Sequence, residues 1–447
     1  MKLPPLLLAA AAAALAGCAA APQPPLTGYR FPPAALPEGV ARSNRDLAVD
    51  FLDLTFALES GETLDRLLRY DAPVRVSMTA PALEPYRGDL DALLGRLRRE
   101  AGIDIARVSD PAEAQLRIEA VPAEEIARVY PTAACFIVPG ETDWRGFLRH
   151  RGEQQVRWSA QTRLSRAAIF LPPDSTPQDI RDCLNEEITQ ALGPANDLYR
   201  LPDSIWNDDN FHGLATSFDM LMLRALYQPE FRSGMTREAV AAALPKVLRR
   251  VNPAGRGLPR AERAPESSEW ASAIETALAR DGTRANRLAA AADAVAMARA
   301  MRPVDHRLGV SLLTYGRLAL RDDPVTAAKS FAEAYRVLRD IDGAEGIRTA
   351  QAGVHVAALA LGTGNFETAV RLADRHVPGA KAGQNAILLA GLLSIKAEAL
   401  DALGDTEAAR AARLDSLRWA RYGFGDADGA LAREQAQVSE IGRLGEG

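Results

Sequence analysis

The sequence lacks the motifs that identify most enzyme classes. It contains no GxSxG nucleophile motif, no phosphate-binding loop with its lysine and no dinucleotide-binding GxGxxG. Beyond the N-terminus it has no uncharged apolar run of about 18 residues, so we expect no transmembrane helix. The net charge of −5 does not suggest a nucleic-acid partner, which would call for a basic patch. We therefore expect no nucleic-acid partner and no organic cofactor.

The N-terminus has the layout of a cleaved export signal. A lysine precedes an apolar core at residues 6–15, which is too short to span a bilayer. The ending Leu-Ala-Gly-Cys18 resembles the lipobox of bacterial lipoproteins. The resemblance implies that residues 1–17 are removed and that acyl chains on Cys18 anchor the protein to a membrane. Ala19 then implies the outer membrane of the cell envelope, facing the periplasm. The alternative is an ordinary secretory signal that happens to contain a cysteine.

Two cysteines remain after Cys18. Cys135 and Cys183 lie 48 residues apart, and an exported protein meets an oxidising compartment in which such a pair forms a disulfide. Closing that loop would stabilise the fold by about 4 kcal/mol on the chain-entropy model. Two buried free thiols are the alternative.

The middle of the chain alternates helical and strand patterns. Residues 18–43 are rich in proline and predict a tether that follows the lipidated cysteine. Residues 44–252 contain short apolar runs typical of strands, separated by helical patterns, which together predict an α+β domain. The strand-like runs are 74–78, 104–108, 116–121, 135–138 and 167–171, and the helical patterns are 45–58, 90–100 and 123–129.

The C-terminal part predicts an all-α domain with an internal repeat. Residues 253–267 read as a linker rich in Pro, Gly and Arg, and residues 268–447 are helical in pattern. Turn residues recur there every 41 positions, and Ala328, Ala369 and Ala409 follow three of the turns at one interval. The stretches GNFETAV and GDTEAAR resemble tetratricopeptide repeats, which implies a groove that binds a peptide or partner protein. An irregular helical bundle is the alternative. The turns are Asp281-Gly282, Asp322-Asp323, Thr363-Gly364 and Gly404-Asp405.

One predicted helix carries the chemical signal. It starts at Pro177 after the capping residue Thr176 and ends at Gly193, which precedes a proline. Helical spacing places Glu187 at the edge of the apolar face, where a carboxylate is costly unless it has a partner or a task. A salt bridge to an arginine of the sheet is the simplest explanation.

This helix resembles the zinc helix of metzincin metalloproteases. Their motif HExxHxxGxxH reads EEITQALGPAN here, so the glutamate Glu187 and the glycine match. Glu186, Gln190 and Asn196 replace the three histidines. The run 167–171, expected to be an edge strand, precedes the helix as in metzincins. Further metzincin-like elements lie downstream, at Asp219, Leu226-Tyr227 and Gly234-Met235.

The chain resembles still more closely a bacterial family of exported proteins of unknown function. The marks are an EExxQxLG helix at 186–193, the pair Asn196-Asp197, the stretch SIWND at 204–208 and the ending LYxPxxxxGM at 226–235. The resemblance implies a zincin-like domain that belongs to the domains of unknown function. It implies no reaction.

The substitutions predict a pseudo-metalloprotease that holds no zinc. Amide oxygens of Gln190 and Asn196 are poor zinc ligands, and Glu187 would have no metal-bound water to deprotonate. We expect a binding or scaffold module. The alternative is an active hydrolase of peptide or glycan, with Glu186 and Glu187 as the candidate catalytic residues. Such a hydrolase would use either displaced metal ligands at Asp208 and His212 or acid–base catalysis by paired carboxylates without a metal. The expected cleft residues are Asp197, Asn207, Asp208, Asp219, Tyr227 and Met235.

Overall fold

The structure is a computed structural model, and several predicted features lie outside the residues that it describes. The signal peptide, Cys18, almost all of the tether, Asp208 and Asp281 fall in the parts not described. The described residues are 31, 40–207, 211–279 and 282–425.

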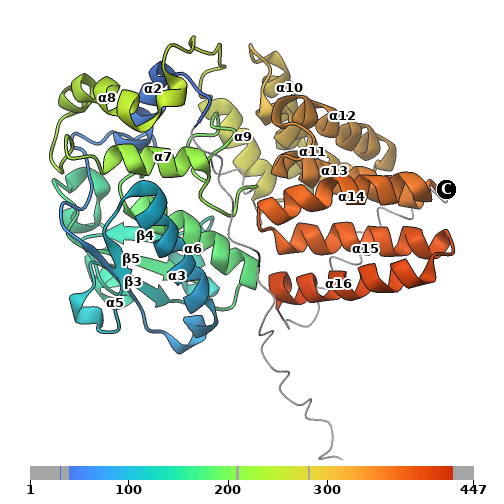
Figure 1. The fold of residues 1–447 in the computed structure, drawn as a ribbon, viewed down its shortest axis with the longest axis horizontal. Coiled ribbons are helices and arrows are strands. Elements are labelled where there is room, and N and C mark those ends of the chain that lie inside the picture. Colours follow the sequence, from blue (N-terminus) through green and yellow to red (C-terminus); the bar gives the residue numbers. More distant parts are fainter. Residues whose placement is uncertain (1–30, 32–39, 208–210, 280–281, 426–447) are drawn as a thin grey trace, which may run out of the picture. The chain divides into compact units, whose positions relative to one another are not determined.

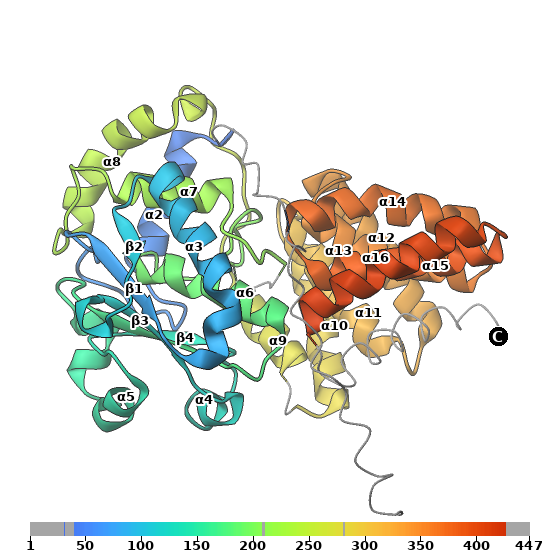
Figure 2. The ribbon, with the colours of Figure 1, turned by 60° about the horizontal axis from the view of Figure 1, so that its bottom comes forward.

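The first region is built on a five-stranded sheet with the order β2-β1-β3-β5-β4 (Figures 1 and 2). Adjacent pairs among β2, β1, β3 and β5 are parallel, and β4 is antiparallel to β5. Each of the five predicted strand runs is therefore a strand of this sheet. The strands are β1 (Val74–Met78), β2 (Ile105–Arg107), β3 (Leu116–Ala120), β4 (Phe136–Pro139) and β5 (Ala167–Leu171).

The prediction that 167–171 forms an edge strand is wrong. Strand β5 lies between β3 and β4, with Ile169 paired to Ile118 on one side and Ile137 on the other. All five of its residues are buried. An apolar run without polar alternation suits an interior strand that is covered on both faces, and the edge strand on this side of the sheet is β4.

Helices cover both faces of the sheet. Ala167, Ile169 and Leu171 join the main core, whereas Ala168 and Phe170 join a smaller aromatic core. This alternation is the two-residue period of a strand. Helices α3 and α6 pack on the first face, and α4 and α5 cover the second. The helices of this region are α2 (Asn44–Thr55), α3 (Arg87–Arg96, continued by a π-turn at Leu97–Ala101), α4 (Ala123–Val129), α5 (Trp144–His150), α6 (Pro177–Ala191), α7 (Ser217–Leu226) and α8 (Arg237–Val251). Short 3-10 turns lie at Pro81–Tyr86, Pro111–Glu113, Gln154–Val156, Trp158–Ala160 and Pro253–Gly255.

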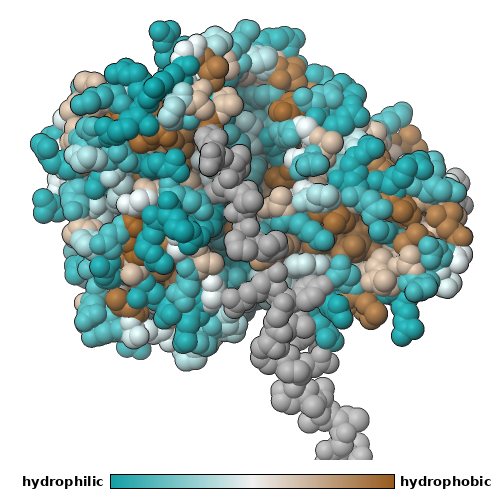
Figure 3. Space-filling model, viewed as in Figure 1, coloured by the Kyte–Doolittle hydropathy of each residue, from teal (hydrophilic) through white to brown (hydrophobic). Residues whose placement is uncertain are grey.

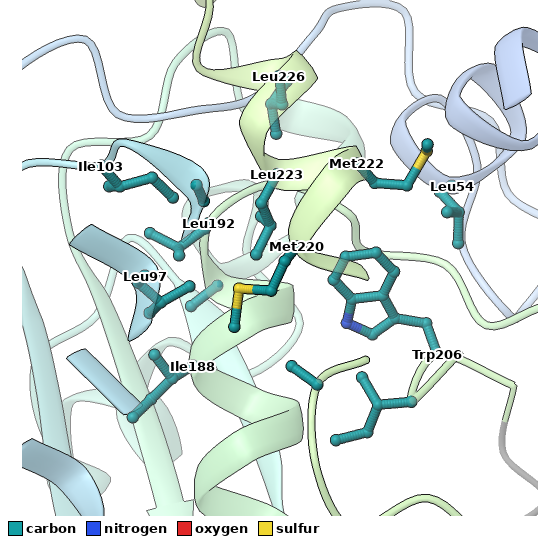
Figure 4. Packing of buried hydrophobic residues seen from close by; sticks show 14 of the residues in the cluster. Leu54, Leu97, Ile103, Ile188, Leu192, Trp206, Met220, Met222, Leu223 and Leu226 are labelled. Atoms are coloured by element: carbon teal, nitrogen blue, oxygen red, sulfur yellow. The ribbon is translucent and has the colours of Figure 1, made fainter. Parts of the chain in front are cut away.

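The main core joins α6 to α7. Figure 4 shows Ile188 and Leu192 of α6 on the side that faces Met220 and Leu223 of α7. Trp206 is fully buried beside them, and its indole N–H donates to the hydroxyl of Thr189 at 3.1 Å. The helix with the metzincin-like spacing is therefore held from two sides by apolar packing.

The predicted disulfide is present. Cys135, next to the start of β4, is bonded to Cys183 in the middle of α6. The bond closes a loop of 48 residues. It links the edge strand of the sheet covalently to the helix that carries Glu187.

The second region is all-helical and repeat-like. Helices pack in consecutive pairs, and the second helix of successive pairs begins at 284, 324, 366 and 406, close to the predicted interval. Ala327, Ala369 and Ala409 are fully buried, each four residues after the cap of its helix. Ala328, which follows its turn at the interval seen in the sequence, lies one position later. The helices are α9 (Ser268–Leu278), α10 (Arg284–Ala300), α11 (His306–Ala319), α12 (Pro324–Asp342), α13 (Ile347–Gly362), α14 (Phe366–Ala382), α15 (Ala386–Ala402) and α16 (Thr406–Phe424).

The two regions share contacts. The rings of Tyr199 and Trp270 lie 5.1 Å apart, and both residues belong to one core with α11 and α12. Within the predicted linker, Arg263 pairs with Asp50 of α2 at 2.8 Å. None of the described helices combines the length and apolarity needed to cross a bilayer.

Candidate functional site

The ends of α6 are set by its sequence. The hydroxyl of Thr176 accepts the backbone N–H of Asp179 at 3.2 Å, and Pro177 occupies the first helical position. At the other end Gly193 has φ +137°, and a Cβ on it would lie 2.4 Å from the carbonyl oxygen of Leu68. Only glycine fits that backbone and that close approach. The predicted boundaries of the helix are confirmed.

Glu187 is buried on α6, with 5% of its surface exposed. Burial, and secondarily the charge of Asp197, raise the pKa of Glu187 to about 8. Among the described residues no arginine or lysine pairs with Glu187, so the simple salt-bridge explanation is not supported. At neutral pH this side chain is largely a neutral acid next to a carboxylate.

Gln190 occupies the position of the second metzincin histidine. Its side-chain N–H donates to the carboxylate of Asp197 at 2.8 Å, and the residue is 8% exposed. The bond places a neutral amide between α6 and the segment that follows it. Asp197 thus interacts with both Gln190 and Glu187, and we call these three side chains the α6 carboxyl group.

Asn196 occupies the position of the third histidine in this spacing, and its side chain binds the backbone of α2. Its side-chain N–H donates to the backbone carbonyl of Asp53 at 2.9 Å, at the end of α2. The residue is 5% exposed. The carboxylate of Asp53 in turn binds Arg200 and Arg237, at 2.8 and 3.0 Å. Asn196 therefore connects the chain after α6 to α2.

This donor set does not fit a catalytic zinc ion. Gln190 donates an amide N–H to Asp197, whereas Asn196 donates one to the backbone carbonyl of Asp53. The two amides are therefore bonded to different segments of the chain. Zinc binds imidazole, thiolate or carboxylate, and Glu186 is the one residue of that kind in the three ligand positions. Within residues 40–207, 211–279 and 282–425, no group of three or more His, Cys, Asp and Glu is arranged to hold a metal.

His212 is the candidate displaced ligand that the structure describes. Burial, with a further contribution from the charge of Arg348, lowers its pKa to about 3, so the imidazole is neutral. The partner expected for it, Asp208, lies outside the described residues.

The predicted cleft residues that follow α6 bind backbone groups around it. Asp219 closes the capping box of α7 and accepts the hydroxyl of Ser204 at 2.6 Å; burial raises its pKa to about 6. The Tyr227 hydroxyl donates to the carbonyl of Leu192 at 3.1 Å, and Asn207 donates to that of Leu201 at 2.8 Å. Met235 is half-buried against the main core. Their described contacts brace α6 and its flanking loops.

Two features of the site were not predicted. Asp182 of α6 is a second carboxyl whose pKa burial raises, here to about 7, and it accepts the amide of Gln178 at 2.8 Å. Asp50 of α2 is fully buried and pairs with Arg42, Arg200 and Arg263. The sequence did offer a signal for this cluster of ion pairs: Asp46 and Asp50 lie four residues apart on one predicted helix, in a chain rich in arginine.

A hollow of about 600 Å³ lies between the end of α2 and the start of α8, away from the α6 carboxyl group. Asp53, Arg66, Arg237 and Glu238 are among the side chains that line it. No residue of α6 does so. The described hollow therefore gives no access to Glu187.

Comparison with known proteins agrees with the resemblance at the level of the domain family. No curated protein and no solved structure matches the chain. The family model described as "Protein of unknown function (DUF2927)" matches residues 44–246, which include the whole sheet, α6, α7 and most of α8. The chain is therefore similar to this family over residues 44–246, a little under half of its length.

Proposed function

We propose that this protein is a lipid-anchored binding or scaffold module of the bacterial cell envelope. In this proposal the DUF2927 domain is a zincin-like fold without hydrolase activity, and the helical region is a tetratricopeptide-like array that holds a peptide or partner protein. Acyl chains on Cys18 would keep both near the outer membrane, on its periplasmic side. The sequence resemblances support the anchor and the compartment.

One observation carries the non-catalytic assignment. The positions that correspond to two zinc-binding histidines hold buried amides, and each amide donates to a group inside the protein. A side chain whose donor is used in this way stabilises the fold and offers at most a weak oxygen ligand. Glu187 would then have no metal-bound water to deprotonate.

The helical region supports a partner-binding role. Helices α13 and α15, the first helices of successive pairs, touch one another, as they would in a solenoid, and a solenoid would offer an extended surface. Figure 3 shows separate apolar patches over this region on the face drawn. Its exposed large apolar side chains include Ile341, Leu403, Leu414 and Leu417.

A second candidate function is hydrolysis that uses carboxylates alone. The observation that favours it is the pKa of about 8 of Glu187, next to Asp197, because a general acid must be protonated at neutral pH. Against it, Glu187 is 5% exposed and the described hollow lies elsewhere.

Co-purification from detergent-solubilised envelopes tests the proposal. The Leu414→Arg, Leu417→Arg double variant should lose the partner, because both side chains are exposed on α16. Leu258→Arg, an exposed leucine outside the array, is the matched control and should retain it. Glu187→Gln should also retain it. Equal recovery by the double variant and the control, or loss of a hydrolytic activity in Glu187→Gln, would contradict the proposal.

A further inference from the structure

A basic surface with an exposed apolar centre surrounds α5. The segment 144–166 holds six arginines and one acidic residue, in a chain whose net charge is −5. All six arginines are exposed. Among the described residues none of them pairs with a carboxylate, whereas the buried Arg96, Arg307 and Arg348 each do. The six are Arg145, Arg149, Arg151, Arg157, Arg163 and Arg166, and we call them the α5 arginines.

One face of α5 is buried, and its exposed face carries a leucine together with arginines. Trp144 and Phe147 point into the small aromatic core, and Phe170 of the sheet lies between 5.0 and 5.7 Å from their rings. The outward positions Arg145, Leu148 and Arg149 follow helical spacing, so they share one face. Leu148 is 47% exposed. A large apolar side chain therefore projects to solvent between two arginines.

A second exposed side chain with a large apolar part packs against α5. The ring of Tyr130, just after α4, lies 6.3 Å from that of Phe147 and is 44% exposed. Figure 2 shows α4 and α5 on the same side of the sheet. The indole N–H of Trp144 donates to Glu125 of α4 at 3.0 Å, which fixes the two helices together. The apolar centre thus has rigid support from the aromatic core.

Guanidinium groups flank both ends of α5. Arg166 donates to the carbonyl of Gly140, before the helix, at 2.8 Å, and Arg157 donates to that of Gly152, after it, at 3.2 Å. Two nearby carboxylates are hydrogen-bonded within the protein: Glu141 binds His150 at 2.6 Å, and Glu119 accepts the backbone N–H of Trp144 at 2.6 Å. Glu119 also interacts with the charge of Arg145. Within 144–166, six arginines against one glutamate still leave an excess of five positive charges.

We propose that this surface binds the headgroup region of an anionic bilayer. Arginines attract anionic phosphates, and Leu148 and Tyr130 would enter the boundary between headgroups and acyl chains, as in interfacial helices. A soluble polyanion would use the charges but would gain nothing from an exposed leucine. The inference goes beyond the proposed function and does not depend on the lipid at Cys18. In an anchored chain the surface would fix which side of the DUF2927 domain faces the membrane.

Vesicle co-sedimentation tests this with residues 18–447 carrying Cys18→Ser, so that no acyl chain contributes. Vesicles of phosphatidylethanolamine with phosphatidylglycerol should bind the protein, and phosphatidylcholine vesicles should not. Because each arginine near an anionic surface contributes roughly fivefold, the triple variant Arg145→Gln, Arg149→Gln, Arg151→Gln should bind at least about 30-fold more weakly. Leu148→Asp should also weaken binding.

The matched control removes the same charge elsewhere. Arg321, Arg375 and Arg410 are exposed arginines of the helical region that form no ion pair with a described carboxylate. Their triple replacement by Gln should leave vesicle binding within about twofold. Equal losses in both triple variants, no binding to anionic vesicles, or binding to dextran sulfate that exceeds vesicle binding and ignores Leu148→Asp would overturn the inference. Circular dichroism spectra show whether each variant is folded.

Discussion

The side-chain amide of Gln190 donates a hydrogen bond of 2.8 Å to the carboxylate of Asp197. In the metzincin spacing, position 190 would present a histidine to zinc. In this protein Gln190 instead stabilises the carboxylate of Asp197, which lies close enough to Glu187 to raise the pKa of Glu187. A position that would hold a zinc ligand in the metzincin spacing thus binds one member of a pair of acids, of which Glu187 is buried.

Replacing Glu187 by Gln should stabilise the protein at pH 8 and much less at pH 5. The folded pKa of about 8 lies above the unfolded value of about 4.3, so the unfolded state loses this proton first as pH rises. The contribution of Glu187 to stability therefore falls between about pH 4 and pH 8. Urea unfolding should show a gain on the order of 3 kcal/mol at pH 8 relative to pH 5. Asp182 has a raised pKa of about 7, and Asp182→Asn is a control with the same sign. An effect of Glu187→Gln that does not vary with pH would refute the raised pKa.

Gly193→Ala should destabilise the protein by more than about 3 kcal/mol, because the new methyl group would meet the Leu68 carbonyl at 2.4 Å in a backbone that L-residues avoid. Gly364→Ala is the matched control: its φ is +74°, with nothing within 4 Å of the new Cβ. The control should lose about 1 kcal/mol. Thermal unfolding of both variants measures the difference. Equal losses would mean that the close approach of Gly193 to the Leu68 carbonyl does not affect the free energy of unfolding.

Asp50→Asn should cost about 3 kcal/mol or more, since it leaves Arg42, Arg200 and Arg263 around a neutral side chain in a buried site. Glu124→Gln removes half of an exposed pair with Arg128 and should cost less than about 0.5 kcal/mol. Urea unfolding at neutral pH compares them. A loss at Asp50 as small as that at Glu124 would show that the arginines do not need this charge.

Removing the disulfide with Cys135→Ser and Cys183→Ser should lower the free energy of unfolding by about 4 kcal/mol, given the loop of 48 residues. Reduction of the wild type with dithiothreitol should have a similar effect, and the reductant should not change the double variant. If the reductant destabilised the variant as well, its effect would not come from this bond.

Local patterns predicted most of the first region. Each strand run, the helix from Pro177 and the disulfide are in the structure, because two-residue alternation, capping residues and paired cysteines act over short distances. The place of β5 was wrong because strand order depends on contacts between distant segments. The residues 167–171 give no local signal that β4, which comes earlier in the chain, pairs with β5 on the side away from β3.

The site was harder to predict than the fold. Spacing alone identified Glu187, Gln190 and Asn196, yet their partners are set by tertiary contacts: Asn196 reaches the end of α2, 143 residues earlier. The buried Asp50 and its arginines depend on the same long-range packing. The repeat interval of the helical region, in contrast, followed from turn residues that the structure places between helices.

We propose that the helix from Pro177 to Ala191 is an internal brace and not a zinc site. The most direct measurement is zinc content by mass spectrometry, on residues 18–447 with Cys18→Ser after equilibration with zinc and removal of the unbound ion. We expect far less than stoichiometric zinc, unchanged in the Gln190→Ala, Asn196→Ala double variant. Stoichiometric zinc that this double variant loses would contradict it.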